Sequence, residues 1–590
     1  MLKRLLSILI FLLPALLLGA GREWTAIRSA EPGPAGTELV FSDPETSIIR
    51  FSVDGFLSKL MQTPRGQAAV ISLKNAFPIM IAGAPDVPKM AGSVIVPDRG
   101  EMGVEVLEAA YREFDHVLIA PSRGNLTRTI DPATVPLRYG PAYEENAFFP
   151  GRLAELGEPY LLRDCRGQAV IVYPFQYNPV TQILRVYYDL KVRVVKVSEQ
   201  GRNPLVRVGP VDHPDGQFQR LYARHFLNYA GDRQAVLDPA GEMLIISYGP
   251  FMEEMGPFVL WKMAKGRNVT MVDVAAIGNS AAIKSYIADY YRTHDLTYVL
   301  LVGDAEQVPA SATAAGYSDN DYAYVAGNDH YPDIFVGRFS AENTDEVRTQ
   351  VTRSLRFEHP HLESQAAARA AVGIASEQGP GDDGEYDYEH VRNINAKLLN
   401  SLCVTGYELF DGSQGGSDGE GDPGPEDVAQ VVNAGPYVIN YTGHGSTSSW
   451  GTSRFSTSDA LSLTNRDGWP FVWAVACVNG NFVNGTCFAE AWLRASTGGL
   501  PAGAAAFLGS TINQYWDPPM CAQDEMNNLL VEAAENETAC TFGALSVNGF
   551  IKMNDVYGIY GEDMTDTWTC FGDPSLIVYY PQRDLPPFRR

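Results

Sequence analysis

Three residues whose side chains can together perform nucleophilic catalysis follow runs of strand-forming residues. Cys477 and His444 come directly after or close behind the apolar runs 471–476 and 437–441, and Glu377 follows a third such run. Open α/β sheets bind ligands beyond the carboxyl ends of their strands. A thiol and an imidazole that follow neighbouring parallel strands can face each other there as nucleophile and base, with a carboxylate to orient the ring.

Glycines surround the candidate histidine. Gly443 and Gly445 flank His444, so the backbone can turn tightly and bring an amide close to a substrate carbonyl. The amides of Gly445 and Cys477 are therefore candidates for an oxyanion hole. Taken singly, such residues are more often a small core cysteine, a turn histidine and, for Glu377, a surface carboxylate. Together, at the ends of neighbouring strands, they indicate catalysis.

The segments that must position these residues alternate between strand and helix patterns. From Met243 onward, apolar runs are interleaved with amphipathic stretches, a rhythm that predicts parallel sheets covered by helices. The expected strands are 243–247, 268–274, 297–302, 370–376, 404–410, 436–441, 471–476 and 503–509, and the expected helices are 252–264, 280–292, 387–401, 425–434 and 488–496. The second series begins near residue 370, so we expect two α/β units.

The preceding part of the chain has a different pattern. The apolar run 168–175 and the alternating residues 183–194, separated by a turn, predict β-strands. This region is therefore expected to be mostly β. The predicted divisions are a mostly-β domain at 21–233, catalytic subdomain A at 234–365, catalytic subdomain B with the active site at 366–581, and a tail at 582–590.

Residues 1–20 have the features of a secretory signal peptide. Lys3 and Arg4 precede an apolar run over 5–18 that is shorter than the roughly 20 residues of a membrane-spanning helix. No later stretch is long and apolar enough to stop transfer. The sequence therefore predicts a secreted protein, periplasmic or extracellular, with no transmembrane segment in its mature form.

Composition excludes several classes of protein. Of the 590 residues, 45% are hydrophobic, and 45 basic against 70 acidic residues give a net charge of −25. Such a chain can fold around large cores, and its negative charge repels phosphate backbones, so nucleic acid is not an expected partner. The seven cysteines are odd in number and scattered, which argues against a disulfide scaffold. No phosphate-binding loop is present, and no organic cofactor is expected.

Two polar clusters have simple interpretations. The glycine-rich acidic segment 411–426 is expected to be a solvated loop rather than a calcium loop. His359 and His361 have no partner cysteine or carboxylate at zinc-ligand spacing, so a zinc enzyme is not indicated.

Several segments together resemble the gingipain family of cysteine peptidases, with most similarity to its arginine-specific members. They are 440–446, 475–480, 510–514 and 571–576, and the similarity extends from about 218 to 578. The resemblance implies a caspase-like α/β core of two side-by-side subdomains with parallel sheets. It also implies that the β-rich half is an inhibitory propeptide.

The resemblance implies roles for the candidate residues. Cys477 is the nucleophile, His444 the general base and acid, and Glu377 the carboxylate that orients the imidazole. The implied activity is that of a thiol protease, made as a zymogen, that cleaves proteins or peptides after arginine. The alternatives are a gingipain-like sortase or maturation peptidase that acts on export signals, and a non-catalytic binding protein.

Specificity for arginine is implied by one acidic position. Asp387 matches the aspartate at the base of the family's specificity pocket, and Trp516 and Met520 match residues that line it. A carboxylate in an apolar slot pairs bidentately with a guanidinium, which favours arginine over lysine. Asp517 departs from the family pattern, and a second carboxylate there would shift preference toward lysine.

Calcium is the one metal that the sequence suggests. Three carboxylates and intervening carbonyls in 304–333 could supply the roughly six to eight oxygens that calcium prefers. The resemblance implies a structural site formed by Asp304, Ala326, Asp329, Tyr331 and Asp333, and a weaker second site with Glu490 and Asp524.

The boundary between the β-rich half and the α/β region is expected to be a processing site. Residues 228–234 form a polar link that contains Arg233, an arginine in front of a domain expected to cleave after arginine. By the resemblance, Arg233 ends the propeptide and pairs with Asp387 until release, so that the propeptide acts as an intramolecular inhibitor.

Overall fold

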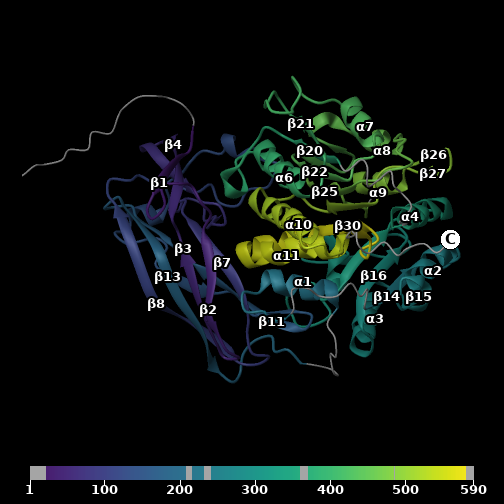
Figure 1. Ribbon diagram of the computed structural model, residues 1–590, viewed down its shortest axis with the longest axis horizontal. Helices are drawn as coiled ribbons and strands as arrows, with labels where there is room; N and C mark the ends of the chain where they lie inside the picture. Colours follow the sequence, from purple (N-terminus) through teal and green to yellow (C-terminus); the bar gives the residue numbers. More distant parts are fainter. Residues whose placement is uncertain (1–20, 207–214, 232–240, 359–369, 484, 580–590) are drawn as a thin grey trace, which may run out of the picture.

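The computed structural model describes residues 21–206, 215–231, 241–358, 370–483 and 485–579. A β-rich N-terminal domain lies on one side of the molecule and an α/β region on the other (Figure 1). Helices α1 (Gly216–His225), α10 (Asp517–Glu535) and α11 (Phe542–Tyr557) lie between the two. The predicted signal peptide, Arg233 and the C-terminal tail fall outside the described residues.

The N-terminal domain is built from three antiparallel sheets. Their strands are β1 (Glu23–Ala26), β4 (Gly55–Thr63) and β5 (Gly66–Ser72); β10 (Tyr160–Leu162), β11 (Cys165–Val172), β7 (Pro88–Ile95), β6 (Phe77–Pro78) and β9 (Ala154–Leu156); and β12 (Phe175–Asn178), β13 (Ile183–Ser198), β3 (Thr46–Ser52), β2 (Gly36–Ser42) and β8 (Glu101–Phe114). Alternate residues of β13, among them Leu190, Val192 and Val194, are buried in one core. The alternation in the sequence thus sets the buried face, and the mostly-β prediction is confirmed.

The α/β region contains one continuous ten-stranded sheet. Its order is β15 (Val269–Asp273), β14 (Glu242–Ser247), β16 (Leu296–Val302), β19 (Phe335–Phe339), β30 (Trp568–Gly572), β28 (Ala506–Ser510), β25 (Phe471–Val475), β22 (Val438–Thr442), β20 (Ala370–Ala375) and β21 (Thr405–Phe410). All neighbouring pairs are parallel except β28 and β30. The predicted fold class, two side-by-side α/β units with parallel strands, is confirmed, and the two units share this sheet.

The strand that joins the two units comes from the far end of the chain. β30 lies between β19 of the first unit and β28 of the second, and the sequence analysis did not predict it. Helices α11 and α12 (Ile559–Thr567) precede it and return the chain to the middle of the sheet. Because β30 is buried on both faces, its residues lack the alternation that marks a half-buried strand.

Helices cover the sheet on both faces. They are α2 (Gly256–Ala264), α3 (Ser280–Thr293), α4 (Thr344–Glu358), α6 (Asp387–Ser401), α7 (Pro425–Asn433), α8 (Thr457–Leu461) and α9 (Phe488–Arg494), in addition to α10, α11 and α12. α3 illustrates the local rule, since Asn279 caps its first turn and Ile283 and Ile287 are buried at helical spacing. In the part of the chain that is described, no helix is long and apolar enough to cross a membrane.

α1 belongs by sequence to the predicted propeptide but packs on the α/β region. Phe218 and Leu221 are fully buried, and Arg224 forms ion pairs of 2.5 Å with Glu525 and Glu532 of α10. The N-terminal domain also touches α11, where Ser93 donates a 2.6 Å hydrogen bond to Asp555. The two parts of the molecule therefore share an extensive polar and apolar contact.

Candidate active site

Cys477 and His444 are placed by two adjacent strands in register. β22 and β25 run parallel with Thr442 opposite Val475, and the two candidate residues each lie two positions further on. Both therefore emerge at the same edge of the sheet. Gly445 packs directly on this edge, because a Cβ atom there would come within 2.7 Å of the Cys477 carbonyl oxygen.

The imidazole of His444 is held by Gln378. Its Nε2 lies 2.7 Å from Gln378 Oε1, and its main-chain carbonyl accepts hydrogen bonds from Tyr441 Oη and the Gly451 amide. Glu377, which the sequence analysis assigned to this role, is exposed, and its carboxylate lies beside Gly412. In this structure, the side chain that contacts the ring is thus that of Gln378 and not that of Glu377.

Asp387 opens α6 at the bottom of a closed pocket. The first turn of this helix is fixed by Glu389, whose carboxylate accepts from the Tyr386 amide at 2.9 Å. Asp387 accepts a 2.6 Å hydrogen bond from the Ser376 hydroxyl and has no exposed surface. Met520 packs against Gly381, where a Cβ atom would come within 2.4 Å of its sulfur.

An arginine of the N-terminal domain fills this pocket. Nη1 of Arg128 lies 3.0 Å from both carboxylate oxygens of Asp387, and both side chains are completely buried. Nη2 donates to the Trp516 carbonyl at 3.3 Å, and the guanidinium carbon lies 4.5 Å from the centre of the Trp516 ring. These contacts combine a charge-assisted pair with a cation–π interaction, which is how proteins recognise arginine.

The backbone around Arg128 pairs with the chain that leads into α10. The Arg128 amide donates to the Gln514 carbonyl at 2.7 Å, and the Trp516 amide donates to Leu126 at 3.1 Å. Thr127 and Tyr515 form the antiparallel bridge between these two bonds. Residues 126–128 therefore lie against the site as an added strand, a common mode of peptide recognition.

The chain turns back immediately after Arg128. The Ile130 amide donates to the Thr127 carbonyl at 3.0 Å, which places Arg128 at the second position of a β-turn. The Trp516 indole donates to the carbonyls of Thr127 and Ile130, at 3.2 and 3.0 Å. Trp516 thus holds the turn closed.

These positions correct the predicted pairing of Arg233 with Asp387. Arg233 lies outside the described residues, and the guanidinium on Asp387 belongs to Arg128. No local pattern in the sequence singles out Arg128, because its partner Trp516 is 388 positions away along the chain.

The electrostatics of the site favour uncharged catalytic groups. Burial raises the pKa of the Cys477 thiol, although a hydrogen bond to the Gln514 backbone and the charge of Arg128 oppose this shift. Burial and the positive charge of Arg128 lower the pKa of His444. Both directions disfavour a thiolate–imidazolium pair while Arg128 occupies the pocket.

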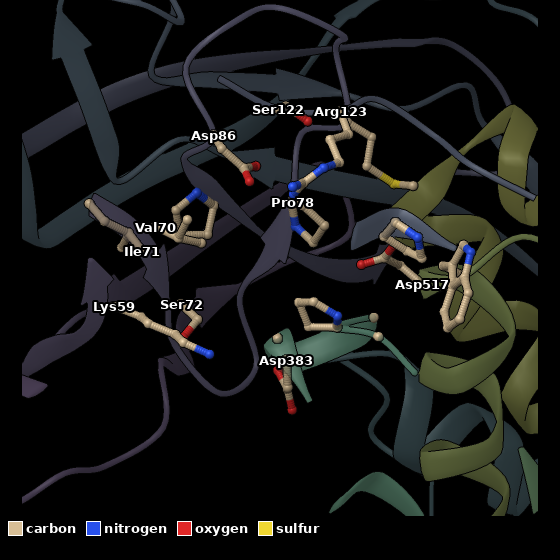
Figure 2. Close-up of a pocket in the computed structure, with 18 of the residues that line it drawn as sticks. Lys59, Val70, Ile71, Ser72, Pro78, Asp86, Ser122, Arg123, Asp383 and Asp517 are labelled. Atoms are coloured by element: carbon tan, nitrogen blue, oxygen red, sulfur yellow. The ribbon is translucent and has the colours of Figure 1, made fainter. Parts of the chain in front are cut away.

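Asp517 lines a cavity that lies beside the arginine pocket. The cavity has a volume of about 310 Å³ and lies between the N-terminal domain and the α/β region. Figure 2 shows Asp86 and Arg123 on one side of it and Asp517 on the other. Burial, reinforced by Asp86, raises the pKa of Asp517 to about 7, and burial raises the pKa of Asp86 to about 6.

The residues predicted to bind calcium are not gathered around a common point. Asp304 pairs with Arg494 at 3.0 Å, whereas Asp333 accepts from the Val325 and Ala326 amides at 3.0 and 2.7 Å. N–H donors thus occupy the carboxylate oxygens that would have to face the ion. In the described ranges, no group of three or more His, Cys, Asp or Glu side chains could hold a metal. As arranged here, these residues do not fit calcium.

The N-terminal domain covers part of the same acidic loop. The Leu161 amide and the Asn203 side chain donate to Asp329 at 2.9 and 2.6 Å, and the ring of Tyr331 stacks on Tyr160 with centroids 3.6 Å apart. The Arg163 amide likewise donates to Asp333 at 2.8 Å.

The two residues of the weaker predicted calcium site have separate partners. Glu490 accepts from Arg494 at 2.8 Å and caps α9 through the Cys487 amide at 2.6 Å. Asp524 pairs with Lys397 at 2.7 Å. The structure therefore does not bring Glu490 and Asp524 together as ligands.

A thiol and an imidazole thus lie at the carboxyl edge of an α/β sheet, and an arginine of the preceding domain pairs with a buried aspartate beside them. The chain belongs to peptidase family C25, whose model matches residues 237–579. The propeptide model of the same family matches residues 33–212. The resemblance drawn from the sequence motifs is thereby confirmed.

Similar proteins are known from Porphyromonas gingivalis. Gingipain R1 is 40% identical over 542 residues, covering 90% of this chain and 53% of its own, so this chain spans about half the length of that relative. Gingipain R2 is 38% identical over 565 residues, covering 93% of this chain and 75% of its own.

Two solved structures have the same fold. The Arg-specific cysteine proteinase gingipain R matches with a TM-score of 0.54 and 38% identity, over 58% of this chain and 79% of its own. The complex of the RgpB pro- and mature domains matches with the same score and identity, over 58% of this chain and 80% of its own.

Proposed function

We propose that this chain is the latent precursor of a cysteine endopeptidase that cleaves peptide bonds after arginine. The observation that carries the proposal is the position of Arg128, whose guanidinium pairs with Asp387 while its backbone extends along residues 514–516. A substrate arginine would bind in the same way. The name of gingipain R, an Arg-specific cysteine proteinase, supports the same specificity.

In the proposed reaction, His444 removes the proton from the Cys477 thiol, and the sulfur attacks the carbonyl carbon of the substrate arginine. The negative charge on the carbonyl oxygen rests on the amides of Gly445 and Cys477. His444 then gives its proton to the leaving amine, and the C–N bond breaks to leave a thioester. Water, deprotonated by His444, hydrolyses the thioester and restores the thiol.

The N-terminal domain is proposed to keep the enzyme latent by substrate mimicry. Arg128 presents the arginine, but the peptide bond after it lies inside the closed turn between Thr127 and Ile130. A bond in such a turn is held away from the extended geometry that attack requires. Because inhibitor and site are on one chain, the effective concentration of Arg128 is high.

Export and calcium binding are further parts of the proposal. The charged and apolar pattern of residues 1–20 supports secretion. Calcium remains a proposal for the processed enzyme, because loss of the N-terminal domain would free the Asp329 and Asp333 oxygens now bound by Leu161, Asn203 and Arg163.

Activity and processing can be tested on one protein and its Cys477→Ala variant. The processed parent should hydrolyse a fluorogenic peptide after arginine faster than after lysine or a neutral residue, and the variant should be inactive. N-terminal sequencing of the processed form should begin at Gln234, after Arg233. Hydrolysis by the Cys477→Ala protein, or preference for a neutral residue, would contradict the proposal, and activity only toward export-signal peptides would favour a maturation peptidase.

A further inference from the structure

Gln378 makes a side-chain contact to the His444 imidazole that the proposed reaction does not use. The residue is half-buried three positions after β20, and its Oε1 lies 2.7 Å from His444 Nε2. With the amide oxygen facing the ring, as it is assigned here, Gln378 accepts the hydrogen bond and Nε2 carries the hydrogen. In the neutral ring the unprotonated nitrogen is then Nδ1, which can act as base in the processed enzyme, once the Arg128 backbone has left the ring.

The backbone of Gln378 is fixed by the groups that build the arginine pocket. Its carbonyl accepts from the Asp387 amide at 3.0 Å, and its own amide donates to the Ser376 hydroxyl at 3.2 Å. That hydroxyl donates in turn to the Asp387 carboxylate at 2.6 Å. One residue thus contacts the base with its side chain and the specificity aspartate with its main chain.

The other groups that act on His444 are Arg128 and Asp131 of the N-terminal domain, Asp387 of α6, and Trp516, which precedes α10; both aspartates raise the pKa of the ring. The Arg128 backbone approaches the ring as a hydrogen-bond acceptor, which raises its pKa, while the charge of the same residue lowers it. The Trp516 ring lies edge-on, with its centroid 6.3 Å away. Gln378 orients the imidazole without adding a negative charge beside it. The ring therefore stays neutral and able to accept the thiol proton.

We propose that Gln378 is the positioning residue of the catalytic base: its side chain holds the hydrogen on Nε2 of His444 and turns Nδ1 toward the Cys477 thiol, and its backbone couples this orientation to arginine binding at Asp387. The role rests on the proposed peptidase function. It differs from the sequence-based assignment, which gave the orienting role to a carboxylate at Glu377.

The first test measures the tautomer and the pKa of the His444 imidazole and does not depend on catalytic activity. The full chain with Cys477→Ala and isotope-labelled histidine is titrated by NMR, with His444→Gln identifying the resonance. We expect the Nε2–H tautomer, an upward pKa shift of about one unit in Gln378→Glu, and loss of the tautomer preference in Gln378→Ala. Gln414→Glu adds the same charge on a neighbouring loop without touching the ring, and should leave both unchanged. A ring protonated on Nδ1, or insensitive to both Gln378 variants, overturns the proposal.

The second test uses the processed enzyme and an arginyl peptide. Gln378→Ala should lower kcat by about 10²-fold with little change in KM, and Gln378→Glu should recover part of the loss while moving the acidic limb of the kcat/KM profile upward. A larger loss in Glu377→Gln than in Gln378→Ala assigns the orientation to Glu377 and overturns the proposal. Absence of cleavage by the parent would contradict the proposed function, and the titration would still decide the role of Gln378.

Discussion

Arg128 and Asp387 form a fully buried ion pair between the N-terminal domain and the α/β region, in which the single nitrogen Nη1 lies 3.0 Å from each carboxylate oxygen. Such a pair adds little net stability, because desolvation offsets the attraction. Removing one partner is costly, by about 3–5 kcal/mol, because the other charge stays buried and unpaired. We therefore expect the pair to add little to the free energy of unfolding. Its main effect is to select an arginine as the side chain that fills the pocket.

Replacement of Arg128 should weaken latency. In Arg128→Ala the pocket has no guanidinium, and the strand contacts of residues 126–128 remain without their anchor. Hydrolysis of an arginyl peptide by the freshly purified, unprocessed chain should rise by about 10-fold or more. Arg112→Ala, at an exposed position of β8, is the matched control. Equal latency in parent and Arg128→Ala would show that the inhibition lies elsewhere.

Asp387→Asn should impair both arginine cleavage and the closed precursor. The amide keeps the shape of the pocket but lacks the charge that pairs with a guanidinium, so kcat/KM for an arginyl peptide should fall by about 10²–10³-fold. Alkylation of Cys477 in the processed enzyme by a small uncharged reagent should change little, because it does not use the pocket. A parallel loss of alkylation would mean that the substitution disturbs the thiol itself.

The stability of the latent form should decrease as pH rises toward neutrality. Asp86 and Asp517 have pKa values of about 6 and about 7 in the closed form, above the ordinary value near 3.9. Burial is the main cause of both shifts, and separation of the domains would return the two carboxyls to water and release protons. The closed form is therefore favoured below the ordinary pKa and loses this advantage as pH passes through about 6 to 7. Arg123 and Arg128 oppose the shifts without cancelling them.

The Asp86→Asn change should expose this effect in melting experiments. On the Cys477→Ala background it should raise the melting temperature by about 3 °C at about pH 8 and by less than about 1 °C at about pH 5. Asp115→Asn, at an exposed position of the same domain, serves as control. A gain that is the same at both pH values would rule out the ionisation of buried Asp86 as its cause.

Calcium should not stabilise the precursor. Amides and Asn203 occupy the Asp329 and Asp333 oxygens, and Arg494 occupies Asp304. The melting temperature of the Cys477→Ala chain should therefore differ by less than about 1 °C between calcium and EDTA, whereas a ligand bound at 100 times its Kd would add about 2.7 kcal/mol. A rise of several degrees in calcium would show that the precursor already contains a calcium site.

The sequence by itself determined the elements and much of the catalytic edge. Hydrophobic periodicity placed strands and helices such as 280–292 and 387–401 within a residue or two of α3 and α6, because the period records which face of an element is buried. It also placed Cys477 and His444 after neighbouring strands. Parallel strands in register carry such residues to the same edge, whatever the rest of the fold does.

Only the tertiary structure determined which elements contact one another. The position of β30 between β19 and β28, the choice of Arg128 for the pocket, and the side chain of Gln378 on the imidazole all depend on contacts between distant parts of the chain. Periodicity cannot predict such contacts, because it records burial but not the partner. Glu377 and Gln378 are adjacent in sequence, yet the direction of the chain after β20 turns one toward solvent and the other toward the base.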